Sequence, residues 1–210
     1  MTLFPAVLGL LLLLLGLDSP VVRPHATTRS TPARPGLSWA EADSLSRKLA
    51  VIEERHNQQK ARKSQPVLVT QGELNSYLNL SYADELPKGV TNVEVRFGSG
   101  RIEAKGYVDV DQVKSSVPSS SSWGALSFLS GQVPIELSGK LVNQDGFGTV
   151  ELDAAYVASI RVPVSLVEQM VASSTKSEKH PDGYDLHAPF RLPYSVTRVR
   201  IEPGKATLEF

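Results

Sequence analysis

The sequence has no cysteine in its 210 residues, and this absence excludes three kinds of chemistry. A disulfide framework, a thiolate zinc site and a cysteine nucleophile all need the missing thiol. The sequence also has no excess of charge, because 22 Lys and Arg are balanced by 22 Asp and Glu. Since this balance provides no global attraction to a polyanion, we do not expect nucleic acid as a partner.

The glycine patterns typical of nucleotide-binding and serine-hydrolase sites are also missing. Gly98 and Gly100 lie between two predicted strands with no helix after them, so they do not form a phosphate loop. No Gly-x-Ser-x-Gly nucleophile motif occurs in the chain. We therefore expect no cofactor and no enzymatic activity.

One long apolar run, Leu3–Leu17, opens the chain. It matches the hydrophobic region of a signal peptide and is shorter than the roughly 20 residues that span a bilayer upright. Residues 1–17 are therefore a cleaved signal peptide or a short membrane anchor. Residues 18–36 are rich in Pro, Ser, Thr and Arg, a composition that predicts an extended linker. We expect the rest of the chain to be exported, either periplasmic or anchored to the membrane by its N-terminal segment.

Residues 37–63 are predicted to form an amphipathic helix. Ser38 and Glu41 have the spacing of a capping box. The end of this helix loses the apolar stripe, so we expect His56 to project into solvent. The apolar residues that recur at helical spacing are Trp39, Ala42, Leu45, Leu49 and Ile52.

A short strand, Val67–Val69, precedes a second predicted helix. Thr70 and Glu73 repeat the capping-box spacing, so Glu73 is expected to act as a capping carboxylate rather than a catalytic one. Leu74, Tyr77 and Leu78 form the expected inner face of this helix.

From residue 93 onward the apolar period changes to two, which predicts antiparallel hairpins over 93–110 and 133–156. The second hairpin is expected to turn within 143–148. Its returning strand should place Val150, Leu152, Ala154 and Tyr156 on the apolar face. Small residues on that face would leave room against the sheet, and they are Ala104, Gly106, Gly139 and Ala154.

A third helix is predicted after Pro163, and a last strand pair is predicted over 197–210. Because every strand alternates and no βαβ spacing occurs, the fold class is α+β. We expect a curved antiparallel β-sheet of hairpins packed on two or three helices, preceded by the N-terminal apolar segment. The sheet domain is expected to occupy residues 64–210.

Two polar patterns resemble functional sites. His180, Asp182, Asp185 and His187 contain metal-ligating groups, but a solvated turn explains them better than a metal site. Asn79 begins an N-glycosylation triplet, which chance explains better than modification. We expect no metal.

The order of elements resembles a group of exported or membrane-anchored bacterial proteins. A short helix opening at Glu73 precedes two hairpins, a Pro163-Val164-Ser165 helix start, Phe190–Pro193 and a final hairpin. This order is similar to the family of the mycobacterial mannan-elongation lipid-binding factor, which resembles one half of a tubular lipid-binding (TULIP-like) module. Over about residues 64–210, the resemblance implies a curved sheet around a helix with apolar ligand between them.

Two functions remain open from the sequence. The first is a noncatalytic cell-envelope protein that binds lipid, a membrane surface or another apolar ligand. The second is a structural or protein-interaction module of the envelope, with a dry core and another envelope protein as its partner. For the first function, the expected apolar lining is Ala104, Gly106, Trp123, Phe128, Leu137, Gly139, Leu166 and Met170.

The apolar run and the proline-rich linker predict export. A reporter that is active only outside the cytoplasm, fused after Phe210, should therefore be active in cells. Deleting residues 1–17 should abolish that activity, because the hydrophobic segment is what the export machinery reads. Equal reporter activity with and without this segment would contradict the prediction.

Overall fold

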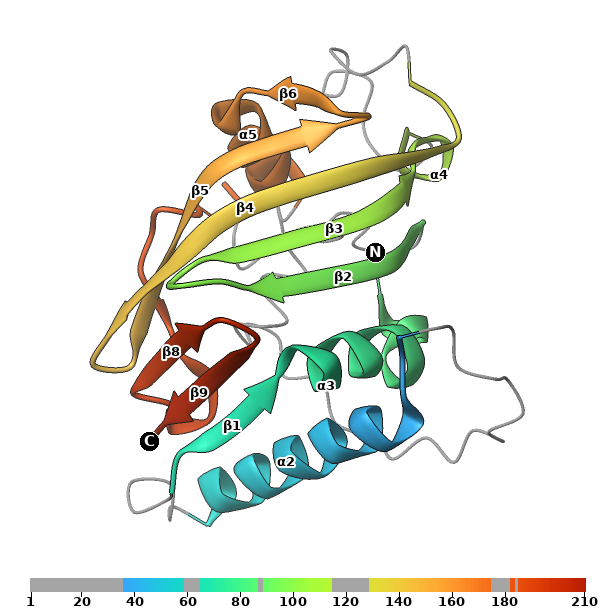
Figure 1. Cartoon of the computed structure of the whole chain (residues 1–210). Coiled ribbons are helices and arrows are strands. Elements are labelled where there is room, and N and C mark those ends of the chain that lie inside the picture. Colours follow the sequence, from blue (N-terminus) through green and yellow to red (C-terminus); the bar gives the residue numbers. More distant parts are fainter. Residues whose placement is uncertain (1–35, 59–64, 87–88, 115–128, 175–181, 184) are drawn as a thin grey trace.

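The computed structural model describes residues 36–58, 65–86, 89–114, 129–174, 182–183 and 185–210. These residues form the predicted α+β fold, with one six-stranded and one three-stranded antiparallel sheet (Figure 1). The predicted fold class is therefore confirmed. Within these ranges, no helix combines the length and apolar character needed to cross a membrane. The expected lining residues Trp123 and Phe128 lie outside the described residues.

The helical elements and strands follow one another along the chain. The helical elements are α2 (Trp39–Asn57), α3 (Gln71–Ser76), the π-helical turn η2 (Tyr77–Ser81), the 3-10 turn η3 (Ala83–Glu85), α4 (Val110–Lys114), α5 (Val164–Ser174) and the 3-10 turn η5 (Pro193–Ser195). The strands are β1 (Val67–Thr70), β2 (Val90–Phe97), β3 (Ile102–Asp109), β4 (Gln132–Gln144), β5 (Phe147–Val157), β6 (Ile160–Val162), β7 (Phe190–Arg191), β8 (Arg198–Glu202) and β9 (Lys205–Glu209).

The larger sheet has the strand order β2-β3-β4-β5-β6, and β7 pairs with the far end of β5. Its two longest strands, β4 and β5, form one hairpin closed by Asp145 and Gly146. Both turn residues have positive φ, +51° and +82°. An Asp-Gly pair adopts this conformation at low cost, which is why the turn falls inside the predicted segment 143–148.

The pairing of β4 with β5 contains one extra residue. Ser138 pairs with Ala154, but the next residue on β4, Gly139, pairs with Leu152. Asp153 therefore has no residue paired with it across the strands on β4, which is the geometry of a β-bulge.

This bulge corrects the expected faces of β5. Because side chains alternate along a strand, one extra residue exchanges the faces of all residues beyond it. Ala155 and Val157 are buried, whereas Tyr156 is 37% exposed. The prediction that Ala154 and Tyr156 lie on the apolar face was therefore wrong.

The smaller sheet has the order β1-β9-β8 and joins the N-terminal and C-terminal parts of the described chain. It also contacts both hairpins of the larger sheet. The Gly204 N–H donates to the Phe97 carbonyl at 3.0 Å. Asn143 of β4 accepts from the Val199 N–H of β8 at 2.7 Å and donates to the Val199 carbonyl at 2.9 Å.

The outer edge of β2 is covered by the helical segment α3–η2 rather than by another strand (Figure 1). Amide side chains spaced four residues apart on this segment bond to alternate residues of β2. We call these three side chains the amide ladder. They are Gln71, Asn75 and Asn79, which bond to the backbone of Phe97, Val95 and Val93.

Asn75 and Asn79 each supply both a donor and an acceptor, as a neighbouring strand would. The Val95 N–H donates to Asn75 Oδ1 at 2.7 Å, and Asn75 Nδ2 donates to the Val95 carbonyl at 3.0 Å. The equivalent bonds between Val93 and Asn79 measure 3.1 and 2.7 Å. Four α-helical residues rise about 6 Å and two strand residues about 6.8 Å, so the spacing from Gln71 to Asn75 nearly matches that from Phe97 to Val95.

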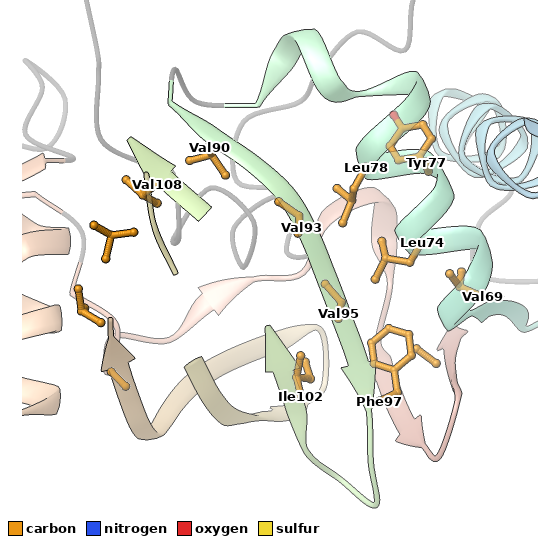
Figure 2. Close-up of a cluster of buried hydrophobic side chains, with 14 of the residues drawn as sticks. Val69, Leu74, Tyr77, Leu78, Val90, Val93, Val95, Phe97, Ile102 and Val108 are labelled. Atoms are coloured by element: carbon orange, nitrogen blue, oxygen red, sulfur yellow. The ribbon is translucent and has the colours of Figure 1, made fainter. Parts of the chain in front are cut away.

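The main core lies between α3–η2 and the inner face of the larger sheet. Figure 2 shows Leu74 and Leu78 beside Val93 and Val95 of β2. Val95 is completely buried, and Leu78 is nearly so. The predicted inner face of this helix is therefore confirmed, and the amide ladder holds its apolar side chains against the sheet.

The amide ladder leads to a prediction about stability and association. Replacing Asn75 and Asn79 by Ala leaves the backbone groups of Val93 and Val95 unpaired, so each substitution should lower the free energy of unfolding by about 1–3 kcal/mol. An unsealed edge is also a template for pairing with another chain. The measurements are urea denaturation and sedimentation velocity.

The matched control is Asn57→Ala, at an exposed helix end. It should change stability by no more than about 0.5 kcal/mol. The double variant should self-associate and the control should not. Unchanged stability and a monomeric double variant would contradict a sealing role for these amides.

Candidate functional site

The candidate site is the middle of the inner face of the larger sheet. Ala104 of β3 pairs with Leu137 of β4, and Gly106 pairs with Ile135. These positions are half-buried, whereas Val95 and Val108 on the same face are almost fully buried. The central strip of the apolar face is thus less completely covered than its surroundings.

Helix α5 packs against the same core as this strip. Leu166 and Val167 are partly buried against the main core cluster, as are Ala104, Ile135 and Leu137. Three of the expected lining residues, Ala104, Leu137 and Leu166, therefore border the same core. Met170 lies on α5, but its side chain lies outside the described set.

Gly139 has a different role from the one expected. A Cβ at this position would lie 2.5 Å from the Glu151 carbonyl oxygen, closer than real Cβ atoms approach. Glycine is thus needed because the bulge brings the backbone of β5 close. At Gly106 a Cβ would lie 3.4 Å from the Thr91 carbonyl oxygen, which is ordinary contact. Close strand packing therefore accounts for Gly139 without any ligand.

A second cluster, built around the buried Glu73, fixes α2 to α3. Lys48 Nζ donates to both Glu73 oxygens at 2.6 and 2.7 Å, and Ser44 Oγ donates to Oε1 at 2.6 Å. The Thr70 N–H also donates to Glu73, at 2.9 Å, completing the predicted capping box. The expected capping role of Glu73 is confirmed, and the bonds from α2 were not visible in the sequence.

The pKa of Glu73 reflects two opposing effects. Burial by itself raises the pKa of the carboxyl. Hydrogen bonds from Lys48, Ser44 and the Thr70 amide outweigh burial, so the pKa lies below its ordinary value of 4.5. Glu73 is therefore a structural anion at neutral pH, with its oxygens occupied by these donors.

The first predicted capping box does not form. Ser38 precedes α2, but its side chain makes no capping bond. Its N–H instead donates to Ser76 Oγ at 3.1 Å, and Ser76 donates to Glu41 Oε2 at 3.1 Å. Packing against α3 redirects both residues, because Ser76 is fully buried and needs partners.

His56 has a partner that the sequence did not indicate. Its Nδ1 lies 2.9 Å from Ser195 Oγ, and its ring packs edge-on against Tyr194 at 5.9 Å between centroids. Tyr194 and Ser195 have φ of +53° and +64°, a strained conformation for both. His56, Asn57 and Gln58 are exposed, so the prediction that this end of the helix projects into solvent is confirmed, and the contacts of His56 lie at the surface.

The other titratable candidates also have structural partners. Burial, with smaller contributions from Tyr82, Tyr194 and Glu85, raises the pKa of Tyr77 to about 12. Tyr77 therefore remains neutral at physiological pH. Asn79, in the glycosylation triplet, is engaged in the amide ladder.

His187 Nε2 lies 2.9 Å from Glu168 Oε1 of α5, and His180 lies outside the described residues. The Asp185 carboxylate accepts from the His187 N–H at 2.9 Å. Across the part of the chain that the structure describes, no three His, Asp or Glu residues are grouped to hold a metal.

Comparisons of the chain with protein-family models, with curated proteins and with solved structures give no match. The resemblance to the lipid-binding factor family therefore stays a prediction.

The Glu73 cluster leads to a prediction about pH dependence. Since the pKa of Glu73 is lowered by folding, its contribution to stability is present above pH 4.5 and is lost as pH falls through the folded value. Glu73→Gln should lower the free energy of unfolding at pH 7 by about 2 kcal/mol. It should also flatten the stability profile below pH 4.5.

The control is Glu54→Gln, on the exposed side of α2. Urea denaturation from pH 3 to pH 7 should give this variant the same profile as the unmodified protein, within about 0.5 kcal/mol. Identical profiles for both variants would show that the Glu73 cluster does not anchor α2.

Proposed function

We propose that the chain is a noncatalytic cell-envelope protein that binds lipid or another apolar ligand between the inner face of the larger sheet and α5. The observation that carries this proposal is the half-buried central strip formed by Ala104, Ile135 and Leu137. Apolar ligand sites are lined mainly by such side chains, with few polar groups. The N-terminal apolar run supports an envelope location.

The character of α5 supports the same proposal. Glu168 is the only charged residue of this helix, and its carboxylate is held by His187 on the loop that follows. The side chains that face the sheet, Leu166 and Val167, are themselves only half-buried. A helix of this composition can cover an acyl chain without an unpaired charge in the contact.

The main polar clusters support a noncatalytic role. Glu73, Ser76 and Asn79 are each occupied by bonds that hold the helical layer together. His56 and Ser195 contact each other, but their side chains are exposed, and no carboxylate bond to His56 is seen within the described ranges. Such a pair lacks the third group that orients a catalytic base.

The alternative is a structural or protein-interaction module with a dry core. One observation favours it: Leu166 and Val167 pack against the same core cluster as the half-buried strip. A helix of the same chain could then occupy all the space that a ligand would need. The two functions differ in whether extra volume at the strip is tolerated.

Two alanines on opposite faces of the larger sheet provide a matched test. Ala104 lies on the inner face, and Ala154 lies on the outer face because of the bulge. With delipidated protein and fluorescently labelled palmitic acid, Ala104→Trp should weaken binding about tenfold, because the indole occupies the proposed site. Ala154→Trp should leave the affinity unchanged.

Thermal unfolding of the same variants separates the two functions. In a ligand site, Ala104→Trp should cost little stability, because the space is available to the larger side chain. In a dry core it should cost about 1–3 kcal/mol by overpacking. Absence of probe binding by the unmodified protein, combined with this loss of stability, would favour the interaction module.

A further inference from the structure

The hairpin formed by β4 and β5 extends well past the rest of the larger sheet. The last residue of β4 that pairs with β3 is Gly139, opposite Ile102. Residues 140–151 therefore continue past β3 as a ribbon of β4 and β5, which β7 joins near the tip, and the tip lies at the lower left of Figure 1. One face of this ribbon packs against other parts of the protein. The opposite face, which we call the bare face, is exposed to solvent.

The packed face of the ribbon contacts the smaller sheet and the segment before it. Val150 is buried against Leu192 and Val196, and Leu141 lies at the border of the same cluster. Asn143 bonds to Val199. These contacts fix the direction in which the opposite face points.

The bare face carries two large apolar side chains near the tip. Val142 is 50% exposed and Phe147 is 52% exposed. Val142 pairs with Thr149, and Phe147 pairs with Gln144, so the two side chains lie diagonally on one face. Diagonal neighbours lie about 7–8 Å apart, which makes this one small apolar patch.

Cationic side chains lie on both sides of this patch. Arg191 is the cross-strand partner of Phe147, and Lys140 lies two residues before Val142 on the same strand. Both are exposed. The acidic groups nearby are Glu151, which pairs with Lys140, and Asp145 in the turn. We call Lys140, Val142, Phe147 and Arg191 together the hairpin surface.

We propose that the hairpin surface is the contact between this protein and a lipid bilayer with anionic head groups. Phe147 and Val142 enter the boundary between head groups and acyl chains, and Lys140 and Arg191 contact the phosphates. This proposal rests on the proposed function, because a protein that takes up lipid needs a place to meet the membrane.

The size of the patch favours a bilayer over a protein partner. A stable protein interface buries about 800 Å² on each side, more than two exposed apolar side chains provide. A bilayer needs much less when the domain is already held near it. The apolar run ends at Leu17 and α2 begins at Trp39, so the 21 residues between them reach at most about 70 Å. If the apolar run serves as a membrane anchor, these 21 residues keep the domain close to the bilayer. The hairpin tip then meets the bilayer at a high effective concentration, so a weak contact is sufficient.

The absence of cysteine allows a direct test on the full chain. A single cysteine introduced by Thr149→Cys, on the bare face beside Val142, is labelled with an environment-sensitive fluorophore. The matched label is at Glu103→Cys, which is exposed on the same outer face but lies beside the base of the ribbon, away from its tip. Each labelled protein is mixed with vesicles of phosphatidylcholine containing phosphatidylglycerol.

The label at residue 149 should shift to shorter wavelength with these vesicles, and the label at 103 should not. Phe147→Glu should reduce the fraction of protein bound to the vesicles, as reported by the label at residue 149, about tenfold, because Phe147 supplies most of the apolar area of the patch. Lys140→Glu should reduce it in low salt and have less effect in high salt. Circular dichroism verifies that both variants remain folded, as expected at exposed positions.

Equal responses at residues 103 and 149, or none at 149, would overturn the proposal. A response at 149 to soluble envelope proteins without vesicles would also overturn it, in favour of a protein partner. Binding of labelled palmitic acid, measured without vesicles, should be unaffected by Phe147→Glu. If the unmodified chain binds no palmitic acid but the tip label responds, the proposed function fails while the bilayer contact is supported.

Discussion

The structure depends on how the edge of β2 is closed. A strand at the edge of a sheet has N–H and C=O groups that need partners, and here no strand provides them. Gln71, Asn75 and Asn79 provide them instead, from a helical segment whose repeat nearly matches that of the strand. Because these side chains bond from the flank, Leu74 and Leu78 are placed over the inner face, where the core forms.

The need to pair backbone groups at strand edges also connects the two sheets. Asn143 bonds to the backbone of Val199 on β8, as Asn75 and Asn79 bond to the backbone of β2. Glu73 and Ser76 bind α2 to the back of α3. These buried or half-buried polar groups have hydrogen-bond partners in neighbouring elements, and the bonds fix those elements relative to one another. The helical layer therefore closes the edge of the larger sheet, and the two surfaces that we propose for binding lie on that sheet.

The larger sheet offers two such surfaces with different physical character. The central strip around Leu137 is apolar and half-buried, and it borders the same core as Leu166 and Val167 of α5. The hairpin surface is small, exposed and bordered by cations. In the proposed function the two would act in sequence, with the ribbon meeting a membrane and the strip holding what is taken up. The tight packing at Gly139 and the bulge at Asp153 fix the geometry between them.

The sequence by itself determined the class of fold and most of its elements. Alternation of apolar residues is a local property, so it identified the hairpins, and the Thr70–Glu73 spacing identified the start of α3. For the candidate site, the pattern correctly placed Ala104, Leu137 and Leu166 against one core. It could not separate a dry core from a ligand site, because both require the same apolar face.

What only the tertiary structure decided are features that depend on residues far apart in the chain. The bulge at Asp153 moved Ala154 and Tyr156 to the outer face of the sheet. One extra residue reverses which alternate side chains face inward, and the local sequence pattern does not reveal it. The bonds from Asn79 to Val93 and from Lys48 to Glu73 span 14 and 25 residues, so no local pattern encodes them. Ser38 has the spacing of a cap, but its N–H donates to Ser76 and Glu41 accepts from Ser76, because the buried Ser76 hydroxyl needs partners.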